Sequence, residues 1–101
     1  MSQTALYQRR ATVRDLVIMQ TPRRWRHFPF LPVVRRPTEH DSPELGVLYD
    51  ARAVSGITGY RCTVFLVNLF ALPLSEASLL VQPRCTYDNF EELLDDGWIV
   101  D

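Results

Sequence analysis

The feature that most constrains this fold is the stretch of residues 59–72, which opens at Gly59 and closes before Pro73. The first half of this stretch alternates with a period of two, and the second half is apolar on both sides except for Asn68. This pattern predicts a long β-strand whose far end is covered on both faces. Such a strand lies inside a sheet, because an edge strand this apolar would pair with other chains.

Two further strands and a turn are expected before this stretch. Residues 31–36 can form a first strand, which Pro37 ends, and residues 44–50 alternate as a second strand. Residues 51–58 form a turn or bulged tip, where Gly56 and the following Gly59 can adopt positive φ. The simplest arrangement of the three strands is an antiparallel meander.

The C-terminal part contains the clearest helix signal. Residues 75–82 are ambiguous between one helical turn and a strand, and their apolar run 79–81 favours a strand that ends before Pro83. Further on, Asp88 and Glu91 have the spacing of a capping box, and Gly97 supplies the helix stop. Residues 98–100 then form a short closing strand or an apolar tail laid on the core.

These segments predict an α+β fold, in which a small single domain contains a mostly antiparallel sheet of three to five strands. One C-terminal helix, at about residues 88–96, packs on a face of the sheet. A chain of 101 residues has room for one core, and we assign the domain to residues 21–101. Residues 1–20 form a mobile or loosely helical basic N-terminal arm, because Arg9 and Arg10 interrupt its helical stripe.

The net charge of −1 hides a strong asymmetry along the chain. Residues 1–36 carry eight arginines against one acid, whereas residues 37–101 carry three arginines against eleven acids. A basic front and an acidic back are typical of an arm that binds nucleic acid. They are also typical of an arm that docks on acidic surface of the same or a neighbouring copy.

The candidate interaction residues form a basic group and an acidic group. Arginines interleaved with aromatic rings suit nucleic acid, since guanidinium groups pair with phosphates and rings stack on bases. In the other interpretation, the rings of this proline-rich stretch anchor the core and the arginines form a solvated face. The acids near the helix C-terminus oppose the helix dipole, which suggests that they meet the basic segment within one chain or between copies. The basic candidates are Arg23, Arg24, Trp25, Arg26, Arg35 and Arg36, and the acidic candidates are Glu91, Glu92, Asp95 and Asp96.

The residues that could support catalysis or bind a metal lack the spacing that these functions need. The two histidines and two cysteines show no paired metal-ligand spacing, so we expect no metal and no cofactor. Cys62 and Cys85 sit in apolar or strand-like contexts, where reduced thiols are usual. We therefore expect no enzyme, and keep a small enzyme that uses Cys62 or His27 as a remote alternative.

The sequence thus favours a non-enzymatic interaction module that acts through protein–protein contacts, with a homodimer as one such contact. Its expected surface is the loop of residues 25–32 together with the acidic helix end. The alternative is a nucleic-acid-binding protein that uses the Arg/aromatic segment 23–36. No apolar run reaches the ~20 residues that a membrane span needs, and no apolar leader follows the N-terminus. We therefore expect a cytoplasmic location and no membrane partner.

Overall fold

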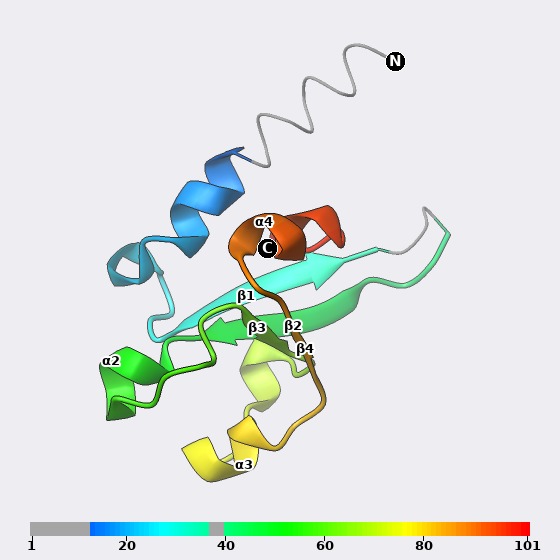
Figure 1. The fold of residues 1–101 in the computed structure, drawn as a ribbon. Helices are drawn as coiled ribbons and strands as arrows, with labels where there is room; N and C mark the ends of the chain where they lie inside the picture. The colour runs from blue at the N-terminus through cyan, green and yellow to red at the C-terminus, as the bar shows by residue number, and fades with distance from the viewer. Residues whose placement is uncertain (1–12, 37–39) are drawn as a thin grey trace.

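The described residues form a five-stranded antiparallel sheet with helices on both of its faces (Figure 1). This computed structural model describes residues 13–36 and 40–101. The predicted α+β class and the antiparallel sheet are confirmed. The strands are β1 Phe30–Arg35, β2 Glu44–Tyr49, β3 Thr63–Phe65, β4 Arg84–Thr86 and β5 Ile99–Val100, in the spatial order β4-β3-β2-β1-β5.

The helices of the described residues are short. They are α2 Ala51–Ser55, α3 Glu76–Leu80 and α4 Phe90–Asp95, with the 3-10 turns η1 Pro22–Arg24 and η2 Leu69–Ala71. Residues 13–19 are also helical. In Figure 1 the segment 13–19 and α4 lie above the sheet, and α3 lies below it.

Each face of the sheet packs against its own cluster of buried side chains. Successive residues of β2 alternate between the clusters, with Leu48 in one and Val47 and Tyr49 in the other, as the two-residue period of a strand requires. Because β2 is covered on both faces, every residue from Gly46 to Tyr49 is buried. The first cluster contains Met19, Trp25, Leu31, Val33, Leu48, Val64, Phe90, Leu93, Leu94 and Trp98, and the second contains Val47, Tyr49, Ala51, Phe65 and Leu79.

The expected meander of three strands is present. Strand β1 pairs antiparallel with β2 from Phe30↔Tyr49 to Arg35↔Glu44, and β2 pairs antiparallel with β3. The closing strand expected near the C-terminus is β5, which pairs antiparallel with β1 through Val33↔Val100.

The long strand expected over residues 59–72 is confirmed only for β3, residues 63–65, and is wrong on both sides of it. Residues 59–62 form a bend and a turn, in which the Thr63 N–H donates to the Tyr60 carbonyl oxygen at 3.3 Å. Strand β3 does lie inside the sheet, between β2 and β4, and its Val64 and Phe65 are fully buried. The chain then turns, because the Val67 N–H donates to the Phe65 carbonyl oxygen at 2.8 Å. Next, the Asn68 side chain caps η2 by accepting the Phe70 N–H at 3.0 Å. An apolar run has no period that would reveal this turn.

The strand expected over residues 75–82 is also wrong, since this segment contains α3. Ser75 caps the helix, and its hydroxyl accepts the backbone N–H of Ser78 at 3.1 Å. The inward-facing Leu79 is 3% exposed and belongs to the second cluster. Strand β4 follows only after Pro83.

The C-terminal helix is present with tighter bounds than the expected 88–96. Its cap is Asn89, whose side-chain oxygen accepts the Glu92 N–H at 2.9 Å, and not Asp88. The Glu92 carboxylate in turn accepts the Asp88 N–H at 3.1 Å. Gly97 ends the helix with φ of 97°, as its position predicts.

The expected turn over residues 51–58 contains the short helix α2. Asp50 caps this helix by accepting the Ala53 N–H at 3.3 Å, and Gly56 ends it with φ of 75°. Gly59 has φ of 95°, so both glycines adopt the positive φ that was expected of them.

Most of the predicted N-terminal arm, residues 1–12, lies outside the described residues. In the described part, Met19 is fully buried in the first cluster. The Asp15 carboxylate is buried as well, and accepts the backbone N–H of Val100 at 3.0 Å. This bond joins the helical segment 13–19 to β5.

Candidate interaction surfaces

The basic stretch around Trp25 separates into exposed arginines and a buried ring. Arg23, Arg24 and Arg26 are exposed, whereas Trp25 is 7% exposed. The Trp25 indole N–H donates to the Ile18 carbonyl oxygen at 2.8 Å, which fixes the ring against the helical segment 13–19. The Trp25 ring is therefore packed in the core, and only a small part of it is open to a partner.

Arg35 brings the basic stretch and the acidic helix end together within one chain. Its guanidinium donates to the Glu44 carboxylate at 2.8 Å and to the Asp96 carboxylate at 2.7 Å. The same group lies 4.6 Å from the centroid of a Trp98 ring. The Glu44 hydrogen bond and the two carboxylate charges raise the pKa of Arg35 although its burial opposes this. Arg35 is thus committed to internal contacts, while Arg36 stays exposed.

Asp96 also accepts a hydrogen bond from the Tyr87 hydroxyl. That hydroxyl accepts the indole N–H of Trp98 at 3.1 Å. Burial, followed by the bond to Asp96, raises the pKa of Tyr87. These contacts connect the end of α4 to β1 and to the ring of Trp98, so Asp96 has a structural role within the chain.

The remaining acidic candidates face solvent. Glu91, Glu92 and Asp95 are all exposed. Glu92 completes the cap of α4 through its bond to Asp88. Glu91 and Asp95 therefore remain as the part of the predicted acidic surface that is available to a partner.

A surface that the sequence pattern did not indicate lies on residues 66–83, here named the apolar segment. It contains a single charged residue, Glu76. On its inward side, Leu79 belongs to the second cluster, and Leu69 and Leu72 pack against that cluster. Its outward apolar side chains are open to solvent, with Phe70 88% exposed, Val81 76% exposed and Leu74 fully exposed.

The one charge of the apolar segment is directed at the rest of the domain. The Glu76 carboxylate accepts hydrogen bonds from the hydroxyl of Tyr49 and from that of Ser55, the latter at 2.8 Å. The Tyr49 bond, and then the Ser55 bond, lowers the pKa of Glu76. Burial and the Glu76 bond raise the pKa of Tyr49 to about 12. The exposed apolar side chains therefore have no free charged neighbour within this segment.

Cys62 and His27, the residues of the small-enzyme alternative, lie in different environments. Cys62 is half-buried, and burial raises the pKa of its thiol although the neighbouring Arg61 acts in the opposite direction. A thiol with a raised pKa is a weaker nucleophile at neutral pH, because less of it is thiolate. His27 is exposed. Within residues 13–36 and 40–101, no three His, Cys, Asp or Glu side chains are grouped so that they could hold a metal ion.

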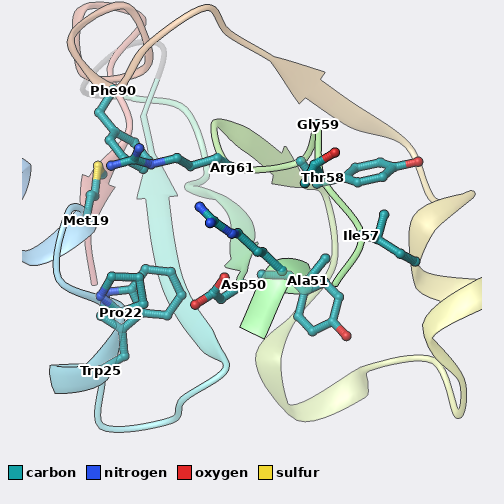
Figure 2. A pocket seen from close by; sticks show the side chains of 13 residues that line it. Met19, Pro22, Trp25, Asp50, Ala51, Ile57, Thr58, Gly59, Arg61 and Phe90 are labelled. Carbon is teal, nitrogen blue, oxygen red and sulfur yellow. The ribbon is translucent and has the colours of Figure 1, made fainter. Parts of the chain in front are cut away.

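A pocket of about 500 Å³ opens between the segment that contains Met19 and Trp25 and the loop of residues 57–61 (Figure 2). Figure 2 shows Arg61 extending beside Phe90 at one side of this pocket, with Asp50 near its middle. The lining residues come from four separate stretches of the chain, 19–25, 49–52, 57–61 and Phe90, so no local sequence pattern could have revealed the pocket.

Comparisons of this chain with protein-family models, with curated proteins and with solved structures found no match. Among the helices of the described residues, none is long and apolar enough to cross a bilayer.

Proposed function

We propose that this protein is a non-enzymatic interaction module that acts through protein–protein contacts, with the apolar segment as its main contact surface. The observation that carries the proposal is the exposure of Phe70, Leu74 and Val81 in a segment without a free charge. Large exposed apolar surfaces on small domains usually mark interaction sites, and the centres of interfaces are depleted of charged residues. The expected contact loop of residues 25–32 is less suited to this role, because Trp25 is buried.

A second copy of this chain is the first partner to test. A domain of about 100 residues buries only a modest share of its unfolded surface when it folds. Self-association would bury further apolar surface and so add to the stability of the fold. The exposed arginines of the basic front and the exposed acids of α4 also give two copies complementary charges.

The perturbed ionisable groups support a non-enzymatic role. Tyr49 and Glu76 are partners of one another, and Arg35 and Tyr87 share Asp96 as a partner. Structural hydrogen bonds of this kind shift pKa values without any catalytic purpose. These groups act as links between elements of the fold.

The proposal is tested by sedimentation velocity of the wild-type chain and of the double variant Phe70→Ser/Leu74→Ser. Full burial of each side chain contributes roughly 1.5–3 kcal/mol, so loss of both weakens self-association by two orders of magnitude or more. Val54→Ser is the matched control, because Val54 is 54% exposed on α2, outside the apolar segment. We expect a dimer that the double variant loses and the control keeps. A wild-type chain that stays monomeric at high concentration, or a dimer unaffected by the double variant, contradicts the choice of partner and surface.

The nucleic-acid alternative retains one specific observation. Arg23, Arg24 and Arg26 are exposed, and Phe28, which follows them, is 46% exposed and could stack on a base. Fluorescence anisotropy with random single- and double-stranded oligonucleotides tests it. Binding that weakens steeply with salt and is lost in Arg23→Gln/Arg24→Gln/Arg26→Gln, but not in Arg52→Gln/Arg61→Gln, favours this alternative. Absence of binding at low salt removes it.

We also propose a cytoplasmic location. Cys62 and Cys85 are both free thiols. Free thiols are typical of reducing compartments, whereas small secreted domains rely on disulfides.

A further inference from the structure

We propose that the pocket between Trp25 and Arg61 binds a small amphiphilic anion, a flat ring system of one or two fused rings that bears one carboxylate. The pocket volume of about 500 Å³ falls in the range of small-molecule sites. Such sites are mostly apolar, with a few polar groups that converge on the ligand. This site goes beyond the proposed protein–protein contacts and is distinct from the apolar segment.

The floor of the pocket is apolar and fixed in place. Met19, Trp25 and Phe90 all line it, and all three belong to the first core cluster. Met19 is fully buried, and Trp25 and Phe90 are 7% and 5% exposed, so packing fixes all three side chains. Of the three, only Trp25 and Phe90 offer surface that a ligand can contact. The Trp25 indole N–H is bonded to the Ile18 carbonyl oxygen and is not free to rotate into the pocket. A preformed apolar floor favours a flat ring that displaces water from it.

The wall of the pocket carries a net positive charge. Arg52 and Arg61 line it together with one acid, Asp50. The Asp50 carboxylate already accepts the Ala53 N–H as the cap of α2. Two ion pairs are found among residues 13–36 and 40–101, and Arg35 forms both of them. Neither Arg52 nor Arg61 takes part in an ion pair among these residues.

The positive charge of Arg61 lies next to the apolar floor of the pocket. Its guanidinium carbon lies 5.3 Å from the centroid of the Phe90 ring, so the cation sits over the edge of the floor. Figure 2 shows the Arg61 side chain reaching across toward Phe90 and Met19. A ligand ring seated on the floor therefore brings an attached carboxylate within reach of this guanidinium. Arginine suits a carboxylate because its planar fork can donate two parallel hydrogen bonds.

Isothermal titration calorimetry with 2-naphthoate tests the proposal, with the neutral 2-naphthamide as the matched ligand. We expect 2-naphthoate to bind with one-to-one stoichiometry, and 2-naphthamide to bind at least tenfold more weakly because it lacks the charge. Arg52→Gln and Arg61→Gln should each weaken 2-naphthoate binding at least tenfold. Both side chains are exposed, so the variants keep the fold, and thermal unfolding checks this.

Two control variants locate the binding. Arg23→Gln removes an exposed charge outside the pocket, and Phe70→Ser/Leu74→Ser removes the exposed apolar side chains of the apolar segment. Both should leave the affinity for 2-naphthoate unchanged. The proposal is overturned by no binding in the millimolar range, by equal affinity for the amide, or by affinity that neither Arg52→Gln nor Arg61→Gln lowers. Loss of 2-naphthoate binding in Phe70→Ser/Leu74→Ser alone also overturns it, because the ligand would then bind the apolar segment.

Discussion

Gly46 is the position at which the smallest substitution should have the largest effect on stability. It lies in β2, and a Cβ atom there would be 2.4 Å from Cγ1 of Val64, 3.2 Å from the Phe65 carbonyl oxygen and 3.3 Å from the Trp98 ring. Carbon atoms in contact normally lie about 3.5–4.0 Å apart. Gly46→Ala therefore forces a methyl group into space that is already filled.

The neighbours of Gly46 have little freedom to move. Val64 is fully buried and β-branched, so its Cγ1 has few alternative rotamers. The Phe65 oxygen belongs to the backbone of β3, which pairs with β2. Over-packing of this kind costs about 1–3 kcal/mol. We expect Gly46→Ala to lower the free energy of unfolding by about 2 kcal/mol, which lowers Tm by about 8–16 °C in a domain of this size.

A double-mutant cycle with Val64→Ala measures the clash directly. Val64→Ala removes the methyl group that the new Cβ would strike, at a cost of about 2 kcal/mol for the lost packing. In urea unfolding, the double variant should therefore be at least about 1 kcal/mol more stable than the sum of the single effects. Leu79→Ala is the control partner, because Leu79 lies in the other core cluster and its effect should add to that of Gly46→Ala. Unchanged stability in Gly46→Ala, or additive effects with Val64→Ala, refutes this account of the contact between β2 and β3.

Two further predictions concern bonds between elements. For Tyr49, the pKa is about 10 in the unfolded chain and is raised to about 12 in the folded one. Its contribution to stability is therefore complete below about pH 10 and is lost as the pH rises toward about 12. Thermal unfolding from pH 8 to 11.5 should show a steeper fall of Tm for wild type than for Tyr49→Phe, and parallel curves contradict the assignment. For α4, Asn89→Ala should cost about 1 kcal/mol in urea unfolding as the loss of an N-cap, whereas Asp88→Ala should cost less. A larger effect at Asp88 contradicts the observed cap.

The paired strands β1 and β2 and the helix α4 follow from patterns that the sequence displays locally. Alternation indicates β2, and the first strand, expected over residues 31–36, is β1 at Phe30–Arg35. The observed N-cap of α4, Asn89, is one residue after the predicted cap, Asp88. Both residue types can cap a helix, and each is followed three residues later by a glutamate. The choice between them depends on which start directs Phe90, Leu93 and Leu94 into the core.

The course of residues 66–82 could not be predicted, because it depends on contacts with distant segments. The Leu66 N–H donates to the Pro83 carbonyl oxygen at 2.8 Å, which binds the end of β3 to the approach of β4. A run of apolar residues fits a strand, a turn or a short helix equally well until such partners are known. Ser75 and Asn68 were the available signals, since both are common helix caps.

The exposure of a side chain also depends on tertiary contacts, so the sequence could not predict which candidate site residues are open to solvent. The sequence left Trp25 open as a core anchor or a binding residue, and only its tertiary contact with Ile18 shows that the ring is buried. The pairing of Arg35 with Asp96 joins residues that the charge pattern had separated into two surfaces. Phe70 belongs to the run that was expected to be covered on both faces, and it is 88% exposed because the chain leaves the sheet after Phe65.

The two proposed sites use mostly different parts of the core, and this makes their effects separable. The apolar segment packs on the second core cluster, whereas the floor of the pocket, Met19, Trp25 and Phe90, belongs to the first. A change at Phe70 and Leu74 should therefore alter assembly without altering the pocket, and a change at Arg61 should do the reverse. Two residues of the second cluster, Tyr49 and Ala51, also line the pocket. Of these, Tyr49 also donates a hydrogen bond to Glu76 of the apolar segment. If assembly and ligand binding prove to be coupled, Tyr49→Phe should weaken the coupling, because the Tyr49 hydroxyl joins the lining of the pocket to Glu76.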